Sequence, residues 1–239
     1  TKEDFYFANL ELAKQIFNSF LESDADLLIH LSSLAAVEEF EAKQVLREED
    51  VCNPQSWYGC SKREAENWLL RQNIPVGKKV VILRPPMVHG AGDKGNLGLL
   101  YKMILKGIPY PLSSFNNKRS FICIDNFIFF IQQIIEKRES LSSGIYHVSD
   151  DETVSTKEII EIIEHVSGKN IFSISIPKFI IKGIARVGDF IPIPLNSSRL
   201  RKMTGDLLIS NDKIKNALEV KQLPNSAKEG LIKTIRSFK

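Results

Sequence analysis

The chain has 239 residues, 43% of them hydrophobic, and a formal net charge of +3. This length allows one large domain or two small ones with a substantial core. Lys and Arg are scattered among acidic residues rather than gathered into a stripe, which argues against nucleic acid as a partner. The most apolar run, 121–135, is interrupted by polar residues and is too short to span a bilayer, so no membrane partner is expected.

Cysteine usage and the start of the chain bear on the compartment. Cys52, Cys60 and Cys123 are an odd number without the spacing of a metal site. Unpaired thiols are typical of a reducing compartment, so we expect a cytoplasmic protein without a metal site. The sequence opens on Thr1, and no charged and apolar leader precedes the first amphipathic segment. A secretory signal is therefore not expected.

Helical and strand patterns alternate along the first part of the chain. Helices are predicted at 7–23, 58–72, 97–107, 125–138 and 157–168, and short apolar strands at 26–33, 78–85, 119–124 and 144–149. Such alternation predicts an α/β fold, a Rossmann-like doubly wound parallel sheet with helices on both faces.

The pattern changes from about residue 150 onward, where prolines separate short helices. We therefore predict two units, a Rossmann-like unit at 1–150 that includes a loop segment at 90–120, and a smaller mixed α/β lobe at 151–239. The segment 179–195 has the composition of an amphipathic membrane-surface helix. Gly183, Gly188 and two prolines interrupt it, however, and favour a structural role in the lobe.

The stretch 90–95, Gly-Ala-Gly-Asp-Lys-Gly, has the glycine spacing of a dinucleotide phosphate loop. That motif also needs an acidic residue about 20 positions further on to hold the ribose. The corresponding window, 110–120, contains no acid, and the preceding strand ends in Pro85-Pro86, which donate no backbone hydrogen bonds. These features disfavour the phosphate-loop interpretation.

Tyr58 and Lys62 lie four residues apart on a predicted helix, so their side chains share one face. An ammonium beside a phenol favours the phenolate and lowers a pKa that starts near 10. The pair alone is weak evidence, because the same spacing occurs often by chance on solvated helices. Its context strengthens it: Ser32-Ser33, about 25 residues upstream, would lie at the carboxyl end of a parallel strand, facing the crevice.

Taken together, the segments HLSSLAAV, EEDVCNPQSWYGCSKREAEN, VVILRPPMVHGAGDKGN, NNKRSFICIDN and GIYHVSDDETVSTKEI resemble the extended short-chain dehydrogenase/reductase family over essentially the whole chain. The resemblance implies NAD or NADP as cofactor and a nucleotide sugar, most closely a UDP-sugar, as substrate. It also implies that 84–96 lines the nicotinamide end of the cofactor and the substrate. The family's glycine-rich phosphate loop and first strands precede the point where this chain begins, so they are expected to be missing from it.

The resemblance assigns roles to individual residues. Tyr58 would be the acid/base, Lys62 would bind the nicotinamide ribose and lower the tyrosine pKa, and Ser33 would hydrogen-bond the reacting oxygen. The implied cofactor-binding positions are Ser32, Tyr58, Lys62, Pro85 and Val88, and the implied substrate-binding positions are Ser33, Asn96, Leu97 and Arg119.

Several neighbouring residues have less certain places in this scheme. Relatives have an asparagine at the position of Asn9, in the helix that precedes the first strand. That asparagine has either a structural or a catalytic role. His89 replaces the usual tyrosine of the loop, and a hydrogen-bonded rim histidine is favoured over an extra acid. Segment 36–40, AVEEF, lacks the tyrosine-glycine common in relatives, which weakens the expectation of a substrate contact there. Segment 179–195 is expected to cover the nucleotide.

The expected activity is hydride transfer at a sugar carbon by an epimerase or a 4-reductase, in bacterial surface-polysaccharide precursor synthesis. Dehydration ranks lowest, because Leu34-Ala35-Ala36 replaces the usual acidic pair. Two alternatives remain open: a non-catalytic scaffold or fragment that has lost cofactor binding, and a reductase of a non-nucleotide carbonyl compound. The family's mode of association predicts a homodimer through helices near 4–22 and 57–72.

Overall fold

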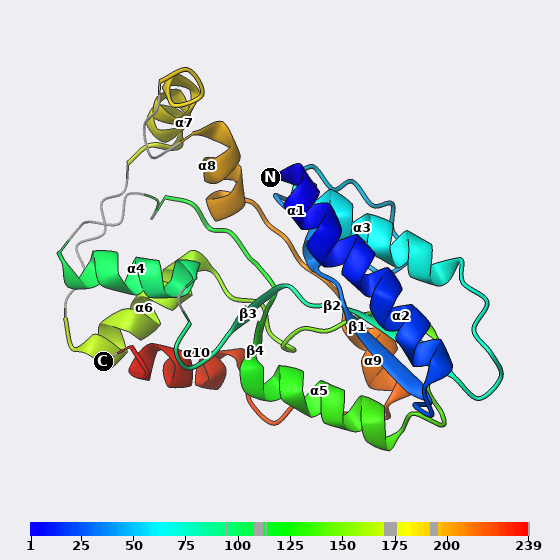
Figure 1. The fold of residues 1–239 in the computed structure, drawn as a ribbon. Coiled ribbons are helices and arrows are strands. Elements are labelled where there is room, and N and C mark those ends of the chain that lie inside the picture. The colour runs from blue at the N-terminus through cyan, green and yellow to red at the C-terminus, as the bar shows by residue number, and fades with distance from the viewer. Residues whose placement is uncertain (94, 108–111, 113, 170–175, 192–195, 239) are drawn as a thin grey trace.

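The computed structural model of the chain describes residues 1–93, 95–107, 112, 114–169, 176–191 and 196–238. Its centre is a parallel sheet of three strands in the order β1-β2-β5, formed by Leu27–Leu31, Lys79–Arg84 and Gly144–His147. The middle strand is buried from Val80 to Arg84, as expected of a parallel strand covered on both faces. The predicted α/β class is confirmed (Figure 1).

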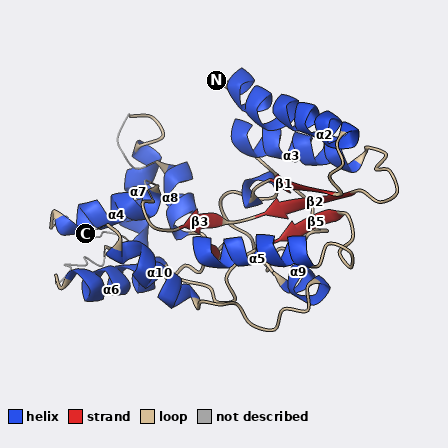
Figure 2. Cartoon of the chain, turned by 60° about the horizontal axis from the view of Figure 1, so that its bottom comes forward, coloured by secondary structure: helices blue, strands red, loops and turns tan. Residues whose placement is uncertain are grey.

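Helices cover both faces of this sheet (Figure 2). On one face lie α2 (Leu12–Glu22) and α3 (Trp57–Leu70), which bury Phe17, Phe20 and Leu69 against it. On the other face lie α5 (Ile124–Glu136) and α9 (Asp212–Ala217), whose apolar residues share a second core with β2 and β5. The strand-helix alternation of the sequence thus becomes a three-layer arrangement.

The first predicted helix contains an irregularity. α1 (Lys2–Tyr6), a π turn called η1 (Phe7–Glu11) and α2 follow one another without a break. A π turn holds one more residue than an α turn and shifts the helix register. Thr1 caps the start of the helix through a capping box with Asp4.

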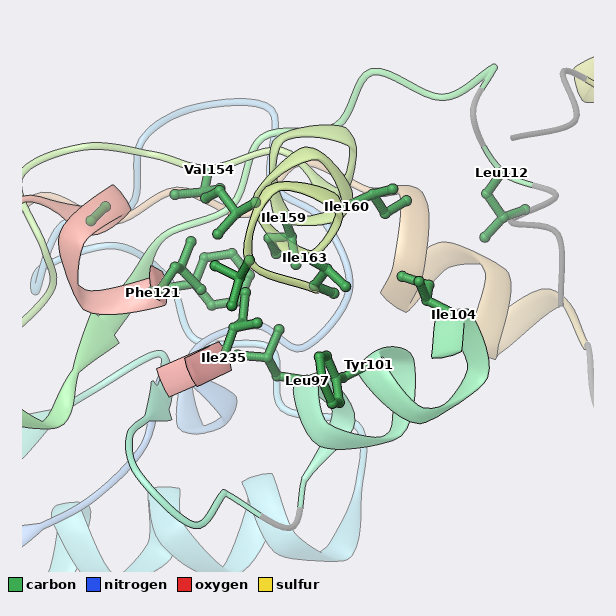
Figure 3. Close-up of a cluster of buried hydrophobic side chains, with 14 of the residues drawn as sticks. Leu97, Tyr101, Ile104, Leu112, Phe121, Val154, Ile159, Ile160, Ile163 and Ile235 are labelled. Carbon is green, nitrogen blue, oxygen red and sulfur yellow. The ribbon is translucent and has the colours of Figure 1, made fainter. Parts of the chain in front are cut away.

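A second lobe is built around two short parallel strands, β3 (Met87–His89) and β4 (Phe121–Cys123). Its helices bury a cluster that includes Leu97, Tyr101, Ile163 and Ile235 (Figure 3). They are α4 (Asn96–Leu105), α6 (Thr156–Ser167), α7 (Lys178–Val187), α8 (Ser197–Thr204) and α10 (Ala227–Arg236). Ser155 caps α6, and Gly168 ends it with a φ of 70°, so the helix ends where the sequence predicts.

Core packing crosses the expected unit boundary at residue 150 in both directions. The helix α4 precedes residue 150 but packs with α6 and α10 in the second lobe. Ile214 and Leu218 follow that residue but belong to the core under the sheet. The two cores therefore consist of interleaved segments.

Candidate active site

The carboxyl ends of β1 and β2 are tied together beside Ser33. Leu34 donates its backbone N–H to the carbonyl of Pro85 (2.8 Å), and Ser32 donates to the carbonyl of Leu83 (2.8 Å). Ser33 Oγ accepts a hydrogen bond from Ala35 N (3.2 Å) and caps a short 3-10 helix, η2, that spans 34–36. Ser33 thus leaves the strand at the crevice edge of the sheet, as predicted.

The first turn of α3 packs directly on η2. Gly59 permits this approach, because a Cβ atom at that position would lie 2.4 Å from the carbonyl oxygen of Ala35. Ser56 caps the helix by accepting a hydrogen bond from Gly59 N (3.0 Å). The half-buried Tyr58 is therefore carried to the segment that begins with Ser33.

Lys62 connects the helix to the end of β1. Its Nζ donates to the carbonyl of Leu31 (2.8 Å) and lies 5.9 Å from the centre of the Tyr58 ring. Burial lowers the pKa of Lys62, and the nearby Glu66 carboxylate opposes that change. The structure thus brings together Ser33, Tyr58 and Lys62 around one strand end.

Asn9 supports this arrangement from the π turn. Its Nδ2 donates to Ser61 Oγ (2.9 Å), and Ser61 Oγ donates to the backbone carbonyl of Tyr58 (2.9 Å). The ring of Phe5 contacts that of Tyr58 edge-on at 6.0 Å between centroids. Asn9 therefore contacts the main chain of Tyr58 through Ser61 and orients the helix turn that carries the phenol.

Ser32 faces the interior instead of the crevice. Its hydroxyl donates to Oε1 of Glu66 (2.6 Å), and Arg84 donates to both oxygens of the same carboxylate. Burial disfavours the charged carboxylate, but the hydrogen bonds and charge of Arg84 prevail, so the pKa of Glu66 lies below its ordinary value. Any cofactor contact at Ser32 would thus be made by its backbone.

Glu39 is a site residue that sequence reasoning missed. Its buried carboxylate accepts hydrogen bonds from Gln55 N (3.1 Å), Ser56 N (2.7 Å) and Ser56 Oγ (2.7 Å). Ser56 in turn caps α3, so Glu39 fixes the loop that leads into the Tyr58 helix. The available signal is the acid within AVEEF, the segment that lacks the tyrosine-glycine pair of relatives.

The expected substrate-binding positions differ in their surroundings. Nη1 of Arg119 donates to three backbone carbonyls, those of Phe40 (3.1 Å), Lys202 (3.0 Å) and Gly205 (3.1 Å). Burial lowers the pKa of this guanidinium, with the nearby Asp206 opposing that change. Arg119 thus joins the second lobe to the segment that follows η2.

The expected binding positions near the two-stranded sheet β3-β4 are less accessible to a ligand. The Leu97 side chain is only 1% exposed and belongs to the lobe core, so a ligand contact there would be made by backbone. Asn96 begins α4, but its side chain lies outside the described residues. Pro85 follows β2 directly, and the half-buried Val88 lies in β3, paired with Ile122.

Gly90 and Gly92 of the glycine stretch make contacts with neighbouring helices in this structure. A Cβ atom at Gly90 would meet Ile124 at 2.6 Å, and Gly92 N donates to Ser237 Oγ (3.3 Å) near the end of α10. His89 is buried, with Nδ1 3.0 Å from Thr234 Oγ1, and burial lowers its pKa to about 4. A neutral, hydrogen-bonded His89 agrees with the structural role favoured by the sequence.

The described residues form neither a metal site nor a membrane-spanning helix. Within the described ranges, no group of three or more His, Cys, Asp or Glu side chains is placed to hold a metal ion. In the same part of the chain, none of the helices combines the length and apolar character needed to cross a bilayer.

Comparison with known proteins assigns the chain to a family. The sequence model of the "NAD dependent epimerase/dehydratase family" matches residues 1–149, which include every element around Ser33, Tyr58 and Lys62. The chain belongs to this family. Its members depend on NAD, in agreement with the expected cofactor.

Two curated members of the epimerase/dehydratase family are similar in sequence. A UDP-glucose 4-epimerase of Vibrio cholerae is 30% identical over 80% of this chain and 56% of its own length. An N-acetyl-alpha-D-glucosaminyl-diphospho-ditrans,octacis-undecaprenol 4-epimerase of Escherichia coli O157:H7 is 26% identical over 52% of this chain and 38% of its own length. The chain spans about half the length of these relatives, or less.

Two solved structures show the same fold. UDP-glucuronic acid 4-epimerase of Bacillus cereus, in complex with NAD, superposes with a TM-score of 0.74 at 19% identity, covering 98% of this chain and 69% of that one. RMD from Pseudomonas aeruginosa, complexed with NADPH, gives a TM-score of 0.73 at 15% identity and covers 98% and 74%. These matches agree with the predicted Rossmann-like architecture.

Proposed function

We propose that this chain carries the proton-transfer centre of a nucleotide-sugar 4-epimerase, or of a 4-reductase with the same chemistry. The observation that carries the proposal is the convergence of Ser33, Tyr58 and Lys62 at the end of β1. Lys62 Nζ donates a hydrogen bond to the Leu31 carbonyl and lies beside the Tyr58 ring. Gly59 allows α3 to contact η2, the turn after Ser33. Both curated relatives are named as 4-epimerases, which favours epimerisation.

Each residue has a task that follows from its position. Tyr58 takes a proton from, or returns it to, a sugar hydroxyl, and the Lys62 ammonium lies 5.9 Å from the centre of its ring. The Ser33 hydroxyl donates to the oxygen that becomes a carbonyl, which orients the sugar. When bound, NAD supplies hydride acceptance and donation.

The residues present fit the nicotinamide end of such a cofactor. Lys62 is anchored through one donor to Leu31 O, so its remaining N–H groups can face ribose hydroxyls. Pro85, directly after β2, and Val88, in β3 of the two-stranded sheet, would contact the ring, and Ser32 would contribute backbone only. Ser32 and Pro85 follow the carboxyl ends of β1 and β2, where ligands of parallel α/β folds bind.

The substrate class follows from Arg119 and from the relatives. We infer a sugar diphosphate, most simply a UDP-sugar, contacted by Arg119 donor groups other than Nη1 and by the backbone at 96–97 at the start of α4. Arg119→Lys should raise the KM for a UDP-sugar, and an unchanged KM would favour a non-nucleotide carbonyl substrate.

A second candidate substrate is a sugar joined through diphosphate to a polyprenol. The undecaprenol-linked name of the E. coli relative supports it, as does the exposed apolar face of α7 described below. Comparing turnover of a UDP-sugar with that of the same sugar on polyprenyl diphosphate separates the two candidates.

The decisive experiment replaces Tyr58 by Phe in the protein at its full natural length. Loss of the proton-transfer group should lower kcat at least about a hundredfold while leaving NADH binding intact. Tyr6→Phe is the matched control, because Tyr6 lies on α1 and its hydroxyl bonds only Glu64 among the described residues. Full turnover by the Tyr58 variant would refute the proposal and favour a non-catalytic scaffold.

We also propose that the protein forms a homodimer through α2 and α3, as the family resemblance implies. Leu12 and Ile16 of α2 and Trp57 of α3 have exposed fractions of 37%, 57% and 56%, although they lie on helices that are otherwise packed. Ile16→Glu should convert a dimer to a monomer in light scattering. A wild-type monomer at micromolar concentration would rule this interface out.

A further inference from the structure

The helix α7 has two apolar faces, and only one of them is covered. Ile181 and Ala185 are buried in the lobe core, with 2% and 0% of their surface exposed. On the outer side, Phe179 is 74% exposed and Phe190, just after the helix, is 90% exposed. The complete exposed set, called the α7 surface here, is Phe179, Ile180, Ile184, Val187, Phe190 and Ile191.

A row of cations flanks the α7 surface. Lys178, Lys182 and Arg186 recur at every fourth position and are exposed, so they lie along one side of the helix. The one acid between 178 and 191 is Asp189, whose carboxylate accepts hydrogen bonds from Ser197 N (2.9 Å) and Ser197 Oγ (2.6 Å). The outer side of α7 is therefore both apolar and positively charged.

Position and continuity suit this helix for contact with a large partner. Figure 1 shows α7 at the upper end of the molecule, next to α8 and away from the three-stranded sheet. The helix runs through Gly183 without a break and ends at Gly188. Of the two glycines that disfavoured an amphipathic helix in the sequence, Gly183 thus does not interrupt it, whereas Gly188 ends it.

Comparison with α5 shows what is particular about α7. The helix α5 also exposes apolar side chains, Ile128 at 46% and Ile135 at 48%. It carries no Lys or Arg between 124 and 136, and it has acids at Asp125 and Glu136. An apolar face with a cationic border occurs on α7 but not on α5.

We propose that the α7 surface docks on an anionic lipid bilayer, with the helix lying in the plane of the membrane interface. Helices of this kind insert aromatic and branched apolar side chains among the acyl chains while Lys and Arg contact anionic headgroups. The cationic row and the lack of an unpaired acid give the charge complementarity that favours a membrane over a second copy of this chain. The proposal replaces the expectation that the protein has no membrane partner and that this segment covers the nucleotide.

The test is vesicle flotation of the purified full-length protein, with phosphatidylcholine vesicles and with vesicles that also contain phosphatidylglycerol. We expect flotation with the anionic vesicles and its loss at high salt. Phe179→Ser and Ile184→Ser should each weaken partitioning about tenfold. Lys182→Gln and Arg186→Gln should each weaken it about fivefold.

Matched controls separate docking through α7 from nonspecific adsorption to vesicles and from misfolding. Ile128→Ser and Ile135→Ser on α5 should leave flotation unchanged, and circular dichroism should show all variants folded. Because the experiment measures vesicle binding and not turnover, its result does not depend on the proposed activity. Equal flotation with neutral and anionic vesicles would overturn the proposal. An Ile184→Ser variant that floats normally would also overturn it. Failure of the wild-type protein to bind vesicles, together with a change of oligomeric state in the Ile184→Ser variant, would overturn it in favour of a contact between copies of this chain.

Discussion

Glu66 of α3 and Arg84 of β2 form an ion pair in which both side chains are fully buried. Nη2 of Arg84 lies 2.7 Å from Oε2 of Glu66, and Nε lies 2.8 Å from Oε1. Ser32 at the end of β1 donates to the same carboxylate. The pair therefore fixes α3, the helix that carries Tyr58, to the strands β1 and β2.

Glu66→Gln should destabilise the fold by about 3 kcal/mol, because it leaves the Arg84 charge buried without a counterion. Chemical denaturation measures the loss. Glu64→Gln, on the exposed side of the same helix, should change the free energy of unfolding by less than about 0.5 kcal/mol. Equal effects of the two substitutions would mean that the buried pair contributes nothing particular.

Acid should destabilise the protein through the buried His89 and His147 and the half-buried His30. Burial lowers the pKa of His30, His89 and His147 to about 4, against 6.5 for an ordinary histidine. The unfolded chain thus takes up protons from pH 6.5 downward while the folded chain does not, so stability is lost as pH falls from 6.5 to about 4.

Thermal melts across that range should show the decline. His147 is completely buried, so His147→Leu should flatten the pH dependence, whereas the exposed His165→Gln should leave it unchanged. A pH profile that is identical in the His147 variant and the wild type would contradict this account.

Gly59→Ala should impair both folding and activity. Its Cβ would be placed 2.4 Å from a backbone oxygen that no side-chain rotation can move, so α3 must shift away from η2. We expect a loss of about 2 kcal/mol or more and a fall in kcat. Gly183→Ala is the opposite case: no atom lies within 4 Å of its added Cβ, and the helix should gain about 0.5–1 kcal/mol. Melting curves that move in the same direction would argue against this distinction.

Glu39→Gln should lower turnover more than its modest effect on stability would suggest. A neutral amide accepts the hydrogen bonds of Gln55 and Ser56 more weakly than a carboxylate, which loosens the start of the Tyr58 helix. We expect a cost of about 1 kcal/mol and a several-fold lower kcat. Glu41→Gln serves as the comparison, because Glu41 contacts Arg201 on the exposed surface. Normal turnover of the Glu39 variant would remove its positioning role.

Local patterns predicted most of the elements. Periodicity indicates both the strand at 27–31 and the helix at 57–70. The order of Ser33, Tyr58 and Lys62 along the chain indicates that their side chains lie close together. The π turn at 7–11 was not predictable, because hydrophobic spacing alone does not reveal one extra residue in a turn.

Long-range contacts account for the rest. The three carbonyl partners of Arg119 come from residue 40 and from 202–205, so no local pattern could reveal them. The position of α4 in the second lobe likewise depends on apolar residues that follow it by more than 50 positions. The path of the helix through Gly183 was missed because the burial of Ile181 and Ala185 outweighs a modest glycine penalty.

The close approach of α3 to η2 depends on the absence of a side chain at position 59, because a Cβ atom there would lie 2.4 Å from the Ala35 carbonyl oxygen. A backbone oxygen cannot rotate away as the end of a side chain can, so a larger residue is accommodated only if the whole helix moves. The distance between the segments that carry Ser33 and Tyr58 is thus limited by the backbone at a single position.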